Sequence, residues 1–144
     1  MTVATLDTFP AGLLAAPLFD RSAEDPINFG TLGSVAEHEV THGFDSMGRK
    51  YDASGNLRDW WTPDDAQRYE QRSKYLVDQY SSYVAAEDIK VNGKLTLSEN
   101  FADGAGAKLA FRAFKDRTHS NSPKSSSFFS RMPLGIAPTL LLNT

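Results

Sequence analysis

The stretch H-E-V-T-H at residues 38–42 contains side chains whose types and spacing suggest chemistry. It has two histidines, with a glutamate directly after the first. In a helix, positions i and i+4 lie on the same face, so His38 and His42 would present their imidazoles to one point in space. Zinc accepts imidazole nitrogens, carboxylate oxygens and a water, and Glu39 is placed to act on that water. The alternative is a surface helix that carries two histidines by chance, and the pentapeptide alone leaves both interpretations open.

A catalytic zinc site has three protein ligands and a position for water, so a third ligand is needed. The best candidate is Glu99, in the first turn of a helix predicted to run from about Ser98 towards Phe114. Asp103 follows four residues later on the same face and could accept the N–H of a ligand histidine. Each acid also has a plain alternative: Glu99 could compensate the dipole of its helix, and Asp103 could be a solvated side chain.

Composition limits the other possibilities. The 144 residues form one domain at most, and there is no cysteine, so any zinc must be held by histidine and carboxylate. The net charge of −3 gives no electrostatic reason to expect nucleic acid or an anionic membrane as a partner. The first residues do not have the pattern of a signal peptide, and no apolar run approaches the ~18 residues of a membrane span. The composition does not indicate an oligomeric state.

The elements that would position these residues are mostly helical. A helix is predicted from about Thr31 to His42, ended by Gly43 in a left-handed conformation, after a polar loop at 21–29. A second helix of some 20 residues begins at Thr62-Pro63, which has the N-cap, the proline and the acids of a good helix start. Between them, residues 44–62 read as an ordered loop. Trp60 and Trp61 in it are expected to anchor the core, and contact with a substrate is the less favoured alternative.

Two short extended segments complete the predicted fold. The apolar residues between Phe9 and Phe19 indicate an edge strand, and residues 88–97 indicate a hairpin with Asn92-Gly93 as its turn. The predicted fold class is therefore mainly α with a small β-hairpin and an edge strand. From Lys115 onward the chain turns polar and rich in serine, so we expect a poorly ordered tail.

Four linked motifs resemble one known family. They are F-P-A-G-L-L at 9–14, H-E-V-T-H-G-F-D at 38–45, Y-D-A-S-G-N-L-R-D-W-W-T at 51–62 and V-N-G-K-L-T-L-S-E-N-F-A-D at 91–103. In order and spacing they are similar to the neprilysin and endothelin-converting enzyme family of thermolysin-like zinc metallopeptidases, over roughly residues 8–115.

The resemblance implies a partial zincin catalytic core and a role for each site residue. His38, His42 and Glu99 would hold one Zn²⁺, and Glu39 would be the general base for a zinc-bound water that attacks the peptide bond. Asp103 would be the carboxylate that supports a ligand histidine. Asp45 would be a buried acid that is structural or supports the site.

The chain also departs from the family. Family members are several times longer, and their large helical domain and substrate-clamping strand have no counterpart here. Only His119 and Arg131 are left for the histidine and arginine with which the family stabilises the oxyanion and grips the substrate. We therefore expect a partial catalytic domain at 1–115 and a divergent tail at 116–144.

Three functions follow as expectations. The first is a zinc metalloendopeptidase that cleaves short peptides, and the second is a catalytically silent zinc-binding remnant of such an enzyme. The third is a helical protein with a fortuitous motif. Family members are often anchored in the membrane with the peptidase outside the cell, so the resemblance implies such a location, although this chain shows no anchor.

Overall fold

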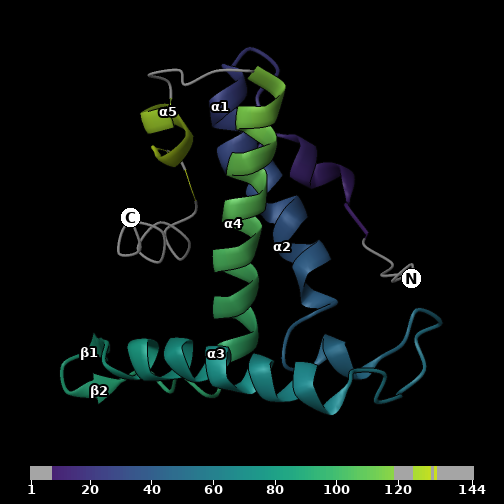
Figure 1. The fold of residues 1–144 in the computed structure, drawn as a ribbon. Coiled ribbons are helices and arrows are strands. Elements are labelled where there is room, and N and C mark those ends of the chain that lie inside the picture. Colours follow the sequence, from purple (N-terminus) through teal and green to yellow (C-terminus); the bar gives the residue numbers. More distant parts are fainter. Residues whose placement is uncertain (1–7, 119–124, 131, 133–144) are drawn as a thin grey trace. The chain divides into compact units, whose positions relative to one another are not determined.

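The computed structural model describes residues 8–118, 125–130 and 132, and Figure 1 shows its elements. The chain divides into two compact units. The first, here called the hairpin unit, comprises residues 42–101. The second, here called the phenylalanine-core unit, comprises the described residues before His42 and after Phe101. The division falls inside two helices, α2 (Ser34–His42) and α4 (Leu97–Thr118).

In the phenylalanine-core unit, the helical stretch that ends in α2 begins earlier than predicted. It starts with α1 (Asp25–Asn28) and passes through the π-helical turn η2 (Phe29–Gly33) before α2. The predicted loop at 21–29 is therefore wrong in its second half. Pro26 lies in the first turn of α1, where a proline has no N–H to leave unsatisfied, so it begins the helix and does not break it.

The apolar core of this unit is built on phenylalanines. Phe114 of α4 and Phe128 of α5 (Ser125–Phe129) are 2% and 0% exposed, and Phe29 and Phe111 pack against them. A Cβ on Gly30 would lie 2.1 Å from the carbonyl oxygen of Phe128, so only glycine allows α5 to approach η2 this closely. The ribbon in Figure 1 shows α1 and α5 near the C-terminal half of α4.

The predicted edge strand near the N-terminus is wrong for the part that the structure describes. Residues 8–20 contain the short 3₁₀ helix η1 (Ala11–Leu14) and no strand. Pro10 and Pro17 flank this turn, and a proline lacks the N–H that a strand would donate to its neighbour. Phe9 and Leu14 are exposed, at 39% and 56%, so this segment does not form the apolar core.

In the hairpin unit, helix α3 (Pro63–Ser81) begins as predicted. The Thr62 hydroxyl accepts the backbone N–H of Asp65 at 3.1 Å and donates to the carboxylate of the same residue at 2.7 Å. This reciprocal pair satisfies an N–H that the helix start would otherwise leave unbonded. The loop before α3 is ordered, as predicted, with the 3₁₀ helix η3 (Gly48–Lys50) and one bridge between Tyr51 and Leu57.

A small antiparallel hairpin follows α3, but not at the predicted place. Its strands are β1 (Val84–Ala86) and β2 (Ile89–Lys90), so the prediction of a hairpin over 88–97 with a turn at Asn92-Gly93 is wrong. A Cβ on Gly93 would lie 2.3 Å from the carbonyl oxygen of Val77. That glycine therefore serves close packing against α3, while Asn92 accepts the backbone N–H of Leu95 in the turn that leads into α4.

Helix α4 is longer than predicted, since it continues to Thr118. The segment expected to be a poorly ordered tail contains α5, and most of its other residues lie outside the described part of the chain. The domain boundary at residue 115 thus stays a prediction. The expectation of a mainly helical fold with a small two-stranded sheet is confirmed. None of the helices in the described residues is long and apolar enough to cross a membrane.

Candidate metal centre

Helix α2 carries the first candidate residues. His38 and His42 lie four residues apart in it, one helical turn, and Glu39 is exposed beside His38. The helix is reinforced near its end because the Thr41 hydroxyl donates to the carbonyl oxygen of Glu37 at 2.6 Å. The prediction that Gly43 ends the helix in a left-handed conformation is wrong. Among the described glycines, Gly55 has a positive φ and Gly43 does not.

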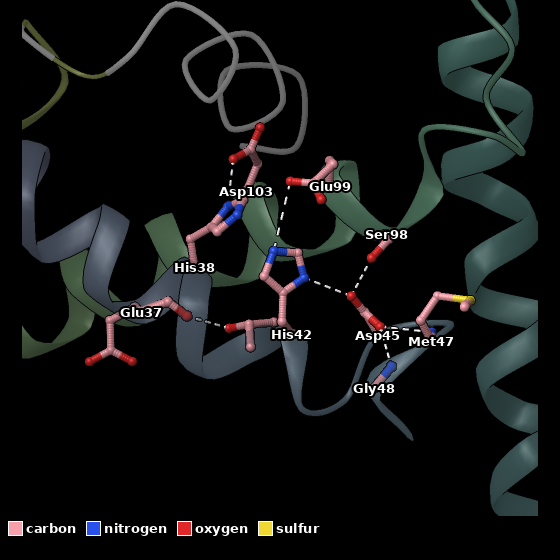
Figure 2. Close-up of polar contacts among 10 residues, drawn as sticks. Glu37, His38, His42, Asp45, Met47, Gly48, Ser98, Glu99 and Asp103 are labelled. Atoms are coloured by element: carbon pink, nitrogen blue, oxygen red, sulfur yellow. Dashed lines mark hydrogen bonds and ion pairs between the residues drawn. The ribbon is translucent and has the colours of Figure 1, made fainter. Parts of the chain in front are cut away.

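Within the hairpin unit, His42 lies between two carboxylates. Its Nδ1 is 2.6 Å from Oδ2 of Asp45, and its Nε2 is 3.7 Å from Oε2 of Glu99 (Figure 2). The first distance is that of a charge-assisted hydrogen bond, and the second is too long for a hydrogen bond. Glu99 is two-thirds exposed, so its carboxylate is within reach of solvent.

Asp45 is the buried centre of a hydrogen-bond network. The residue is 2% exposed, and Oδ1 accepts the backbone N–H groups of Met47 and Gly48, each at 2.7 Å. The Ser98 hydroxyl, one residue before Glu99, donates to Oδ2. Burial alone would raise the pKa of Asp45, but the hydrogen bonds from Ser98, Gly48, His42 and Met47 outweigh it and lower the pKa below its ordinary value. Asp45 is therefore an ionised acceptor for His42 at neutral pH.

Gly48 brings this network close to the end of α2. A Cβ on it would lie 1.8 Å from the carbonyl oxygen of His42, so no other residue fits without displacing the backbone. The loop that carries Asp45 can thus fold back under His42. The loop 43–48 therefore contacts both the side chain of His42, through Asp45, and its main chain, at Gly48.

In the phenylalanine-core unit, the other histidine has a carboxylate partner of its own. Nδ1 of His38 lies 2.8 Å from Oδ1 of Asp103, and both side chains are partly buried. Gly106, nearly one turn further along α4, makes the approach possible, because a Cβ there would lie 2.5 Å from the backbone nitrogen of His38. The two helices are therefore in close contact at this histidine.

Sequence reasoning missed part of the machinery around His42. Ser98 and the N–H groups of Met47 and Gly48 were not among the candidate residues, although G-F-D-S-M-G directly follows the motif. The glycine in that loop was the available signal. His119 and Arg131, the remaining candidates for oxyanion and substrate binding, lie outside the described residues.

Comparison with known proteins gives one consistent result. The sequence model of the family described as Peptidase family M13 matches residues 4–131. The chain is 43% identical to endothelin-converting enzyme 1 of Cavia porcellus over 118 residues, which is 82% of this chain and 16% of that protein. It is 44% identical to neprilysin-1 of Caenorhabditis elegans over 108 residues, 74% of this chain and 14% of that protein.

Solved structures show the same similarity. The Mycobacterium tuberculosis zinc metalloprotease ZMP1, in complex with an inhibitor, matches 91% of this chain with a TM-score of 0.79 and 35% identity, over 21% of its own length. PepO from Lactobacillus rhamnosis matches 91% of this chain with a TM-score of 0.75 and 37% identity, over 20% of its own length. The fold is thus that of part of a zincin catalytic core. The chain spans only 14–16% of the length of the two curated relatives.

Proposed function

Because the chain belongs to peptidase family M13, we propose that it carries the zinc site of a metalloendopeptidase and acts on peptide substrates. The proposed ligands of one metal ion are His38, His42 and Glu99. The observation that carries the proposal is the position of His42, whose two nitrogens face two different carboxylates.

The donor set fits zinc. Two ligand atoms at roughly 2.0–2.1 Å from one tetrahedral ion lie about 3.3–3.4 Å apart. The 3.7 Å between Nε2 of His42 and Oε2 of Glu99 is close to that separation. A direct hydrogen bond would draw the two atoms nearer, to about 2.7–2.9 Å for a charged pair.

The hydrogen bonds of the two histidines support the same assignment. When Nδ1 donates to a carboxylate, the ring presents a lone pair at Nε2, which is the form that binds a metal. Asp45 holds Nδ1 of His42 in this way, and Asp103 holds Nδ1 of His38. Both imidazoles are therefore prepared as Nε2 ligands, and the carboxylates raise their basicity.

Zinc, when bound, supplies a Lewis acid that polarises the scissile carbonyl and lowers the pKa of a water. Glu39 is the residue of this chain that would take the proton of the attacking water and pass it to the leaving amine. It is exposed and follows His38 directly in α2, so a substrate can reach its carboxylate. We propose Glu39 as the general base because of this position in α2 and because of the family to which the chain belongs.

A second candidate function is zinc binding without peptide cleavage. It is favoured by the small share of the relatives that the chain spans, since cleavage also needs groups that position the peptide and stabilise the oxyanion. Loss of one oxyanion donor typically costs on the order of a hundredfold or more in rate.

The test compares three variants for zinc content and for hydrolysis of a fluorogenic peptide. The wild type should bind one zinc, and Glu99→Gln should weaken that binding. Glu39→Gln should keep the zinc and lose activity by at least about a hundredfold. Glu37→Gln removes a carboxylate from the same helix and should change neither property.

Three outcomes decide between the candidates. A wild type that binds no zinc contradicts both functions. A zinc-loaded wild type that leaves the peptide intact supports the silent zinc protein. Activity that survives in Glu39→Gln rejects the proposed base.

A further inference from the structure

A cavity of about 740 Å³ lies in the hairpin unit, apart from the residues proposed to bind zinc. Its volume falls within the roughly 300–1,000 Å³ of small-molecule sites in proteins, which are mainly apolar and contain a few polar groups. Aromatic rings make up much of its wall, and three charged side chains reach it. The lining is Phe44, Trp60, Trp61, Thr62, Asp65, Arg68, Tyr69, Arg72, Ser73, Leu76 and Phe101.

The aromatic wall is held in place by contacts between neighbouring rings. Trp60, Trp61, Tyr69 and Phe101 form a continuous series, each ring edge-on to the next with centroids 5.8, 5.5 and 5.7 Å apart. Edge-to-face pairs of this kind are attractive beyond the area they bury. The guanidinium of Arg49 lies over the rings of Trp61 and Tyr69, at 5.4 and 5.3 Å. The wall is therefore formed without a ligand.

The charged groups at the cavity favour an anion. Arg68 and Arg72 lie one turn apart on α3 and both are exposed. Neither guanidinium forms a hydrogen bond or ion pair with any residue that the structure describes. The carboxylate of Asp65 is the one acidic group in the lining, and it already accepts the Thr62 hydroxyl. Two unpaired guanidiniums thus outnumber one hydrogen-bonded carboxylate.

The cavity and the Glu99 carboxylate belong to different faces of α4. Phe101, in the cavity wall, follows Glu99 by two residues, which is roughly 200° around a helix of 3.6 residues per turn. A molecule in the cavity would therefore lie on the side of α4 that faces away from Glu99. Its binding would not require zinc.

We propose that this cavity binds an aromatic carboxylate. The ring of the ligand packs against the tryptophan and phenylalanine rings, and its carboxylate accepts hydrogen bonds from Arg68 and Arg72. Arginine suits this role because its planar guanidinium matches a carboxylate in two parallel hydrogen bonds. The same chemistry is offered by a free aromatic acid and by a peptide that carries an aspartate beside a phenylalanine.

The experiment uses the whole chain and follows tryptophan fluorescence, because both tryptophans of the protein line this cavity. The probes are 3-phenylpropanoate and its uncharged isostere 3-phenylpropanamide. The carboxylate should give a saturable change in emission and bind at least about tenfold more tightly than the amide, since hydrogen bonds to charged groups are stronger than neutral ones. The same result is expected in Glu99→Gln, so failure here is independent of the zinc proposal.

Two double variants separate a local contact from a general effect of charge. Arg68→Gln with Arg72→Gln should lower the affinity for phenylpropanoate to that for the amide and leave amide binding unchanged. Arg58→Gln with Lys74→Gln removes the same charge from exposed positions outside the cavity, and it should keep wild-type affinity.

Several results would overturn the proposal: no saturable binding of the carboxylate, equal binding of acid and amide, or equal effects of the two double variants. An acetylated and amidated tetrapeptide of glycine, aspartate, phenylalanine and glycine identifies the source of the ligand. Tighter binding of this peptide than of phenylpropanoate assigns the site to a polypeptide, and weaker binding assigns it to a free aromatic acid.

Discussion

Replacing Asp45 by asparagine tests the network around His42 most directly. The side-chain oxygen of asparagine can occupy the Oδ1 position and keep the bonds from the N–H groups of Met47 and Gly48. Its NH₂ group then takes the place of Oδ2, the atom that in the wild type contacts Nδ1 of His42 and the hydroxyl of Ser98. The serine can turn its hydroxyl to accept, but the histidine must present a lone pair at Nδ1 and carry its proton at Nε2.

This change of tautomer affects stability and metal binding differently. We expect the free energy of unfolding to fall by about 2 kcal/mol, because a hydrogen bond to a charged group contributes about 1.5–3 kcal/mol. Zinc affinity should fall by about 10–100-fold, the usual cost of losing the partner of a ligand histidine. The proton at Nε2 of His42 accounts for this loss, since that nitrogen is the proposed donor to the metal.

Asp52→Asn is the matched control. Asp52 lies in the same unit, and its Oδ1 accepts the backbone N–H groups of Ser54 and Asn56 at 2.9 and 3.0 Å; neither His38 nor His42 is among its hydrogen-bond partners. It should change stability much less than Asp45→Asn does, because its carboxylate is exposed, and it should leave zinc affinity unaltered. Urea unfolding and zinc titration against a competing chelator measure the two quantities. If Asp45→Asn behaves like Asp52→Asn in both, the reasoning is refuted.

Three further predictions concern packing and pH. Gly106→Ala should lower the free energy of unfolding by about 1–3 kcal/mol, because its Cβ meets the backbone of His38. In the control Gly33→Ala the nearest atom to the new Cβ is 3.6 Å away, so stability should not change. Similar urea midpoints for the two variants would contradict this prediction. Phe128→Ala should lower the free energy of unfolding by about 3–5 kcal/mol in thermal unfolding, because its side chain is fully buried. Leu109→Ala, at a position that is 45% exposed, should lower it much less. A larger loss in Leu109→Ala than in Phe128→Ala would contradict the described core. As pH falls below about 3.8, Asp45 is protonated in the unfolded chain before it is protonated in the folded chain, where its pKa is lower. The stability that the ionised carboxylate contributes is therefore lost in acid. Urea midpoints measured at stepped pH should fall less steeply for Asp45→Asn than for the wild type, and an identical fall in both would oppose the role of Asp45.

The features that the sequence predicts well are those decided by neighbouring residues. The start of α3 depends on Thr62, Pro63 and Asp65, whose bonds span three residues, and the structure has them as expected. The i, i+4 spacing of His38 and His42 likewise depends only on their being helical. Local chemistry of this kind is complete within one turn of chain.

The features that the sequence predicts badly depend on distant packing. Asn92-Gly93 is a good turn pair for a hairpin, yet Gly93 is required by the carbonyl of Val77, 16 positions earlier in the numbering. The sequence near Ser98 gives no sign of its hydrogen bond, because its acceptor, Asp45, is 53 residues away. The polar residues and Pro26 predict a loop at 21–29, whereas the apolar Ile27 and Phe29 belong to a helical stretch that packs on α5. Such roles become visible only when the contacts are known.

The placement of both tryptophans in the wall of one cavity has a spectroscopic consequence. Emission excited selectively in indole follows the hairpin unit, since the phenylalanine-core unit contributes no tryptophan. Far-ultraviolet circular dichroism, in contrast, reports the helices of both units. Denaturation curves recorded with the two probes will coincide if the chain unfolds as one cooperative body, and they will separate if each unit melts on its own.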